Sequence, residues 1–187
     1  YIPLPCNSST SNLTPKALCS ALDLSLETFL VSYSGRGISS KGWGYSVEAV
    51  IKANKISKRP IALIGLGAGE ALDSIHDQLK LQSNSVMQQI KLLGFRSNAP
   101  EIAAACHCAM MLSYYPGETL NLTLIESLMA GKPSIATAWG AMGEVLRFGY
   151  DDPAGLSVSI SNGVPSVSDA VTALTRLAND EDLYNAM

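Results

Sequence analysis

The sequence predicts a Rossmann-like α/β domain, in which a doubly wound parallel sheet carries helices on both faces. Two observations predict this fold: apolar β-prone runs alternate strictly with segments of helical periodicity, and those runs contain almost no polar residues. Strands buried on both faces are typical of parallel sheets covered by helices. The composition agrees, because 187 residues with 47% hydrophobic and 16% charged side chains support a well-buried core and exclude disorder as the main state.

The first strand–helix unit begins at Phe29. Residues 29–34 form a β-prone run closed by Gly35, and residues 43–56 then show helical spacing at Val47, Val50 and Ile51. The same unit recurs along the chain. Further strands are expected at 60–65, 89–94, 108–114, 133–138 and 156–160. Further helices are expected at 70–81, at 99–106, before Gly131, at 144–148 and, strongly amphipathic, at 167–178.

Residues 1–28 are rich in Ser, Asn and Pro and lack a sustained period, so we expect an entry linker with a short helical turn around 15–22. The domain itself then covers residues 29–187. The chain starts at Tyr1 and shows no signal peptide, which indicates a piece of a longer protein. Its four cysteines do not form a disulfide-dense pattern, so we expect reduced thiols and a cytoplasmic protein.

Charge and hydropathy exclude several classes of partner. The formal net charge of −3 gives no broad cationic surface for a nucleic acid or for anionic lipid. The longest apolar run, 102–112, is interrupted by His107 and is shorter than the ~18 residues that span a bilayer. A bound phosphate would therefore have to be met by local residues.

Ligands of doubly wound sheets bind beyond the carboxyl ends of the strands, so the loops after Ser34, Gly65, Gly94 and Tyr114 should form one crevice. In the first of these loops, Arg36 and Lys41 stand five residues apart just before a helix. A guanidinium fork, an ammonium and free helix N–H groups suit a diphosphate. Ordinary solvated surface charges explain the same loop equally well.

The second loop, Gly65-Leu66-Gly67-Ala68-Gly69-Glu70, invites a dinucleotide-binding interpretation. The third glycine of G-x-G-x-x-G would fall on Glu70, and the first strand–helix unit lacks the pattern, so a nicotinamide oxidoreductase is only weakly indicated. A tight turn and close helix packing explain these glycines better.

The segment 115–133 carries two carboxylates separated by seven residues. Glu118 precedes a helix and can face the crevice, where the N–H groups of residues 119–122 attract an anion. Glu126 lies inside an apolar helix, where an unpaired carboxylate is costly. The structural alternative is a capping box of Thr123 and Glu126, with Glu118 as a turn carboxylate.

Cys106-His107-Cys108 looks like a metal-binding cluster, but it has no second ligand pair at zinc-finger spacing. Core packing at a helix–strand junction is the better explanation. Trp139 follows a strand end beside Gly140, where it can line the crevice or wedge the fold, and the sequence does not separate these two roles.

Taken together, residues 29–177 resemble the donor-binding C-terminal domain of retaining glycosyltransferases of the GT-B fold, particularly the family-four group. Arg36 and Lys41 match that family's phosphate-binding pair after the first strand, and Glu118 with Glu126 match its E-x7-E signature. Residues 130–133, Ala-Gly-Lys-Pro, match the continuation into the next strand, and residues 2–5 resemble the segment that enters this domain.

The resemblance implies a role for each matched residue. Arg36 and Lys41 would bind the donor diphosphate, Glu126 the ribose hydroxyls, and Glu118 the donor sugar near its reacting carbon, as the catalytic candidate. The remaining implied donor-binding residues are Thr119, Leu120, Asn121 and Leu122 beside the sugar and phosphate, and Phe95 and Arg96 beside the base. Many relatives have Gly-Phe-Gly where this chain has 119–121, so the sugar preference is expected to differ, and Asn121 could contact a hydroxyl.

The expected function is sugar transfer with retention from a nucleotide-sugar donor, in polysaccharide or glycoconjugate biosynthesis. The acceptor-binding N-terminal domain is absent from this chain, so the isolated domain should be inactive, and any membrane contact would come from the missing part. No cofactor or metal is expected, because two cations and a helix N-terminus meet the leaving-group charge, and Asp151-Asp152 lacks the spacing of an acidic metal site. The alternative is a non-catalytic nucleotide-binding module of the same fold.

Overall fold

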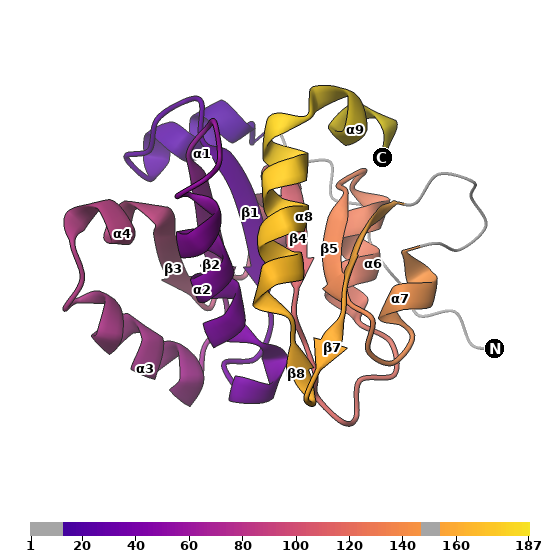
Figure 1. Cartoon of the computed structure of the whole chain (residues 1–187). Helices are drawn as coiled ribbons and strands as arrows, with labels where there is room; N and C mark the ends of the chain where they lie inside the picture. Colours follow the sequence, from indigo (N-terminus) through magenta and orange to yellow (C-terminus); the bar gives the residue numbers. More distant parts are fainter. Residues whose placement is uncertain (1–12, 147–153) are drawn as a thin grey trace.

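A parallel sheet of six strands forms the centre of the computed structural model, which describes residues 13–146 and 154–187 (Figure 1). The spatial order is β3-β2-β1-β4-β5-β6, and every neighbouring pair is parallel. The strands are β1 (Phe29–Ser34), β2 (Ile61–Leu66), β3 (Ile90–Gly94), β4 (Cys108–Met111), β5 (Ser134–Thr137) and β6 (Gly155–Val158). The predicted Rossmann-like fold is confirmed.

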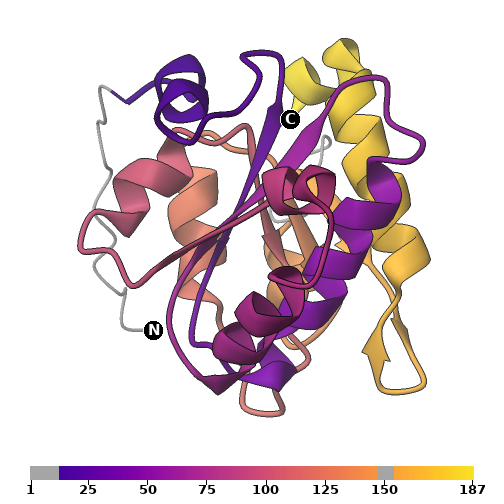
Figure 2. The ribbon, with the colours of Figure 1, turned by 90° about the vertical axis from the view of Figure 1, so that its left-hand side faces the viewer.

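Helices cover both faces of the sheet, as the view along its edge shows (Figure 2). One face carries α2 (Trp43–Ala53), α3 (Glu70–Leu79), α4 (Asn84–Gln89), α8 (Val167–Asn179) and α9 (Glu181–Ala186). The other carries α1 (Pro15–Ala21), α5 (Ala99–Ala104), α6 (Leu122–Met129) and α7 (Met142–Val145). A 3₁₀ turn, η1 (Ser39–Lys41), precedes α2, and a hairpin of β7 (Ile160–Ser161) and β8 (Val164–Pro165) precedes α8.

Alternation along β1 explains how one strand serves both layers. Phe29, Val31 and Tyr33 pack into the core under α2 and α8, whereas Leu30 packs into the core under α1 and α5. Successive side chains of a strand point to opposite faces, so consecutive apolar residues fill two cores at once. Five of the six residues of β1 are buried.

Three short elements depart from the expected pattern. Helices α4 and α9 and the β7–β8 hairpin were not predicted, and neither helix has a buried residue whose spacing would reveal it. The turn expected around 15–22 is helix α1, which packs on the sheet through Leu18 and Cys19. Residues 1–12, including 2–5, and the end of the helix expected at 144–148 lie outside the described residues.

In the part of the chain that the structure describes, every helix is too short or too polar to cross a membrane.

Candidate functional site

The strand order reverses between β1 and β4, and a cleft of about 360 Å³ opens at that point. From β1 the chain builds outward to β2 and β3, then returns to β4 and builds the other way. Connections that leave two adjacent strands in opposite directions open a crevice at the carboxyl ends. The cleft walls come from the end of β1, the loop after it, the segment after β4 and the start of α6.

The loop after β1 brings Arg36 and Lys41 to this cleft, and aromatic donors fix its backbone. The indole Nε1 of buried Trp43 donates to the Arg36 carbonyl at 2.8 Å, and the Tyr33 hydroxyl donates to the Lys41 carbonyl. Gly42 closes the loop with φ of 81°, and a Cβ there would lie 2.0 Å from the Leu112 carbonyl oxygen. The loop therefore depends on glycine where it meets the end of β4.

Glu118 pairs with Lys41 inside the cleft. The Lys41 Nζ lies 2.5 Å from the Glu118 Oε2, with side chains only 14% and 8% exposed. The Ser113 hydroxyl donates to the same oxygen at 2.7 Å. Burial raises the pKa of Glu118, but the hydrogen bonds from Lys41 and Ser113 and the charge of Lys41 outweigh it, so the pKa falls below its ordinary value. Glu118 is thus held as a carboxylate.

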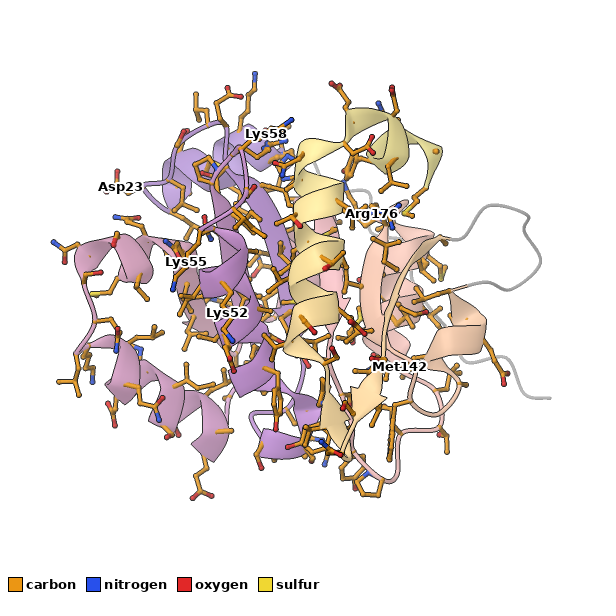
Figure 3. The ribbon with its side chains drawn as sticks, in the orientation of Figure 1. Asp23, Lys52, Lys55, Lys58, Met142 and Arg176 are labelled. Carbon is orange, nitrogen blue, oxygen red and sulfur yellow. The ribbon has the colours of Figure 1, made fainter. Side chains whose placement is uncertain are left out.

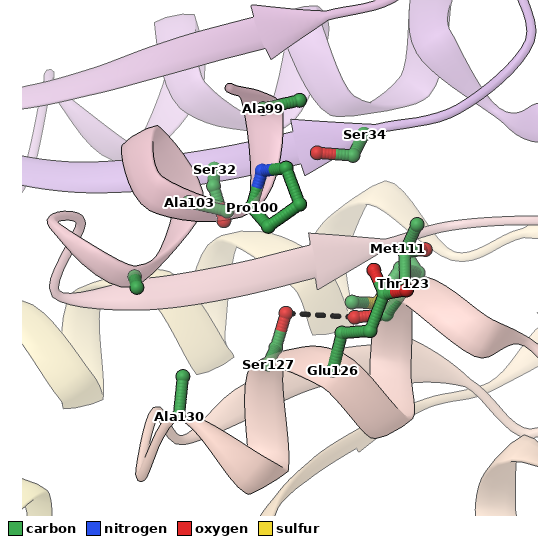
Figure 4. Close-up of a pocket in the computed structure, with 11 residues that line it drawn as sticks. Ser32, Ser34, Ala99, Pro100, Ala103, Met111, Thr123, Glu126, Ser127 and Ala130 are labelled. Carbon is green, nitrogen blue, oxygen red and sulfur yellow. Dashed lines mark hydrogen bonds between the residues drawn. The ribbon is translucent and has the colours of Figure 1, made fainter. Parts of the chain in front are cut away.

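Glu126 lines a second, smaller hollow of about 90 Å³ between α5 and α6 (Figure 4). This hollow shares Ser34, Met111 and Thr123 with the larger cleft, so the two are adjoining parts of one crevice. Most of its other lining residues are small, which leaves the Glu126 carboxylate as its charged group. Arg36, Lys41, Glu118 and Glu126 therefore all reach the same edge of the sheet.

The start of α6 corrects the expected capping. The helix begins at Leu122, and its N-cap is Asn121, whose Oδ1 accepts from the Leu124 backbone N–H at 3.1 Å and from the Thr123 hydroxyl at 2.6 Å. The capping box of Thr123 and Glu126 is therefore wrong, because an asparagine two residues earlier already caps the first turn.

Of the remaining sequence-predicted residues, some line the cleft and others lie outside it. Asn121 and Leu122 line the cleft, with the Asn121 oxygen engaged as a cap, whereas Thr119 and Leu120 are exposed and line neither hollow. Phe95, 79% exposed, and Arg96 follow β3 at the same edge of the sheet and also lie outside both hollows.

The glycines of the second loop have a structural use. The Gly35 N–H donates to the Leu66 carbonyl at 3.0 Å and the Gly37 N–H to the Ala68 carbonyl at 2.8 Å, so the β1–β2 ladder continues into the two loops. A Cβ on Gly67 would lie 2.0 Å from the Gly35 carbonyl oxygen. Close packing explains these glycines as expected, and Gly67 and Gly69 pack against the loop after β1 that carries Arg36 and Lys41, here called the cation loop.

Sequence reasoning missed two residues that follow β4. Ser113 donates to Glu118, and the ring centroid of Tyr115 lies 5.3 Å from the Arg36 Cζ and 5.4 Å from the Lys41 Nζ. Their place at the carboxyl end of a central strand could have indicated both. Trp139, left open between two roles, donates its Nε1–H to the Tyr115 carbonyl at 2.8 Å and packs beside α6 and α7.

Other cations lie away from the crevice. Lys52, Lys55 and Lys58 project outward from α2 and the loop after it, and Arg176 projects from α8 (Figure 3). None of these four lines either hollow of the crevice.

The Cys106-His107-Cys108 segment packs into the core at the amino end of β4, as predicted. Both thiols are buried, and the His107 Nδ1 accepts from the Leu30 N–H at 2.9 Å while its ring stacks on Phe29 at 5.0 Å. Burial, together with the charges of Arg59 and Lys132, lowers the pKa of His107 to about 4. Within residues 13–146 and 154–187 no three His, Cys, Asp or Glu side chains gather as metal ligands, and Asp151-Asp152 lies outside them.

Comparison with known proteins places the chain in a family. Residues 28–180 match the family model described as glycosyl transferases group 1. A phosphatidyl-myo-inositol mannosyltransferase of Mycobacterium leprae (strain TN) is 29% identical over 123 residues, which cover 62% of this chain and 29% of that protein.

Solved structures share the fold. The Anabaena protein Alr3699/HepE, crystallised with UDP and glucose, matches with a TM-score of 0.75 and 20% identity over 95% of this chain and 46% of its own. WaaG, a glycosyltransferase involved in lipopolysaccharide biosynthesis, matches with a TM-score of 0.71 and 18% identity over 92% of this chain and 44% of its own. The chain thus spans less than half the length of each of these relatives.

Proposed function

Because the chain belongs to the group 1 glycosyltransferase family, we propose that it is the donor-binding half of a retaining glycosyltransferase. It binds a nucleoside-diphosphate sugar, and the sugar passes to an acceptor held by an N-terminal domain outside this chain. We place the reaction in cytoplasmic polysaccharide or glycoconjugate biosynthesis. The proposal is supported by the binding of UDP and glucose in a protein of the same fold.

One observation carries the proposal: two cations and two carboxylates from distant parts of the chain line one crevice at the β1–β4 reversal. Breaking the anomeric C–O bond leaves a nucleoside diphosphate with growing negative charge. The Arg36 guanidinium and the Lys41 ammonium stand where they can stabilise that charge, which they do without a metal ion. Glu126, in the adjoining hollow, accepts hydrogen bonds from the ribose hydroxyls.

Glu118 acts on the sugar as an ionised group. Because Lys41 and Ser113 hold it as a carboxylate, it accepts hydrogen bonds from sugar hydroxyls and offers negative charge near the reacting carbon. It does not serve as a proton donor near neutral pH. A diphosphate that binds the Lys41 ammonium competes with Glu118 for it. Binding of the diphosphate therefore affects the carboxylate that contacts the sugar.

Calorimetric titration of the chain with UDP, GDP and ADP tests the binding step. Loss of one charge-assisted contact of about 1.5–3 kcal/mol should make Arg36→Ala bind roughly ten- to a hundredfold more weakly. Arg176→Ala, which removes an exposed cation remote from the crevice, is the matched control and should bind like the wild type. Unchanged affinity in Arg36→Ala would remove the cation loop from the site.

A non-catalytic nucleotide-binding module would use the same crevice, and Glu118→Gln separates it from an enzyme. In a protein that joins this domain to an acceptor-binding half, lost transfer with retained nucleotide affinity supports catalysis. Transfer that survives this substitution contradicts the role of Glu118. The isolated chain should bind nucleotide and transfer no sugar.

A further inference from the structure

Tyr115, in the segment after β4, lies against both cations of the crevice, and the family match does not assign it a role. Its ring centroid lies 5.3 Å from the Arg36 Cζ and 5.4 Å from the Lys41 Nζ. A cation within about 6 Å of an aromatic face is attracted by the ring quadrupole. The phenol ring of Tyr115 therefore joins two positive charges that would otherwise repel each other.

The ring and the two cations are anchored separately. The Trp139 Nε1–H holds the Tyr115 carbonyl, the Trp43 Nε1–H holds the Arg36 carbonyl, and the Tyr33 hydroxyl holds the Lys41 carbonyl. Trp43 and Tyr33 are buried in the core. The backbone under each of the three side chains is thus fixed, which leaves the side chains to meet at the ring.

The turn between Tyr115 and Glu118 packs directly against the Tyr115 ring. A Cβ on Gly117 would lie 2.8 Å from the ring edge of Tyr115, so the chain passes directly against the ring before it reaches Glu118. Glu118 then pairs with Lys41, whereas Arg36 is exposed. The Tyr115 ring is consequently the group that holds the guanidinium near the ammonium.

We propose that Tyr115 is a positioning residue that holds Arg36 and Lys41 side by side, ready for the two phosphates of a nucleoside diphosphate. The inference rests on the proposed function of the crevice. Side chains already gathered in the binding geometry lose less conformational entropy when the ligand arrives. The ring lines neither hollow of the crevice, so its effect passes through the two cations and should be largest for a ligand whose two phosphates engage both.

Three variants test this in the chain: Tyr115→Leu, Tyr115→Phe, and Tyr114→Leu as the neighbouring control, whose ring packs against Tyr45 instead. The probes are the best-bound of UDP, GDP and ADP and the corresponding monophosphate. We expect Tyr115→Leu to weaken diphosphate binding about five- to tenfold and monophosphate binding less than about twofold. Tyr115→Phe should stay within about twofold of the wild type, as should Tyr114→Leu.

A ring-fluorinated phenylalanine at position 115 keeps the shape and removes the negative face of the ring. It should bind diphosphate several-fold more weakly than Tyr115→Phe, and this comparison stands even if Tyr115→Leu fails to fold. Tighter diphosphate binding by Tyr115→Leu would overturn the inference, because the ring would then occupy the place of a phosphate. Equal losses for monophosphate and diphosphate would also overturn it.

Comparing the Tyr115 variants with Arg36→Ala and Lys41→Ala separates this inference from the proposed function. If Arg36→Ala weakens diphosphate binding and none of the Tyr115 variants does, the inference fails and the diphosphate site stands. If neither Arg36→Ala nor Lys41→Ala weakens binding, the diphosphate site itself fails.

Discussion

The two ends of β4 carry contrasting sets of ionisable side chains. At the amino end, Cys106, His107 and Cys108 are the residue types that bind metals, yet they pack into the core, and burial raises the pKa of both thiols. At the carboxyl end, Glu118 lines an open cleft, where it pairs with Lys41 and accepts a hydrogen bond from Ser113.

The difference shows that position in the sheet decides what these residues do. The carboxyl end of β4 adjoins that of β1 at the point where the strand order reverses, so its loop diverges from its neighbour and leaves space. The amino end is closed, because the His107 N–H donates to the Leu30 carbonyl, its Nδ1 accepts from the Leu30 N–H, and its carbonyl accepts from the Tyr184 hydroxyl. Reactive residue types are inert where the backbone is closed around them.

The largest expected effect is at the open end. Lys41→Met leaves the Glu118 carboxylate buried without its cation and should lower the free energy of unfolding by about 3–4 kcal/mol, measured by urea denaturation. Lys52→Met is the matched control, because its pair with Glu48 is about half exposed on both sides and should change stability by less than about 0.5 kcal/mol.

The double variant Lys41→Met/Glu118→Gln sharpens this result. Removing both charges should recover most of the lost stability, since the cost comes from the unpaired carboxylate. The pKa of Glu118 is lowered in the fold, so the ion pair stabilises the protein above the ordinary carboxyl pKa and its contribution disappears as the pH falls through the lowered value. Equal stability losses in Lys41→Met and Lys52→Met would contradict the contrast between the ends of β4.

Acid should act next most strongly, at the closed end. The pKa of His107 falls from 6.5 to about 4, so its neutral form stabilises the protein fully above pH 6.5 and the contribution is lost as the pH drops toward 4. At 1.36 kcal/mol per unit of pKa, the loss between pH 7 and pH 4 amounts to about 3 kcal/mol. Urea denaturation of the wild type between pH 7 and pH 4 measures it.

His107→Asn keeps an acceptor for the Leu30 N–H but cannot titrate, so its stability should depend less steeply on pH than that of the wild type. His76→Asn is the control, because that histidine is exposed on α3. If both variants followed the wild-type pH dependence, the closed end would not hold a neutral histidine.

The sequence predicted the frame of the molecule better than its short elements. The central strands β1, β2, β4 and β5 are buried on both faces, and their apolar runs are visible in the sequence without any partner. Helices α4 and α9 have no buried residue, so no apolar period distinguishes them from loop. The capping box expected at Thr123 and Glu126 was wrong, because Asn121 caps the helix two residues earlier.

The site was predictable where charge and strand ends coincide. Arg36, Lys41 and Glu118 were singled out because they stand between a strand end and a helix start and because they match the glycosyltransferase pattern, and all three line the cleft. Ser113 and Tyr115 were missed, because one hydroxyl and one ring carry no spacing pattern. Their contacts depend on bringing β1 beside β4, which pairs residues 77 positions apart, such as Lys41 and Glu118.

The smallest expected effect is that of zinc on the closed end. The thiolate is the form that binds a metal, and burial raises the pKa of Cys106 and Cys108, while the His107 Nδ1 is already engaged by Leu30. A metal would have to open the core to reach these atoms.

Excess Zn²⁺ should therefore shift the melting temperature by less than about 1 °C. If zinc did bind, a concentration of a hundred times its Kd would stabilise the fold by about 2.7 kcal/mol, which is a shift of several degrees. Differential scanning calorimetry with Zn²⁺ or EDTA makes the measurement, and Cys106→Ala is the matched variant. A zinc-dependent rise of several degrees that Cys106→Ala abolishes would make the amino end of β4 a metal site and end the contrast between the two ends.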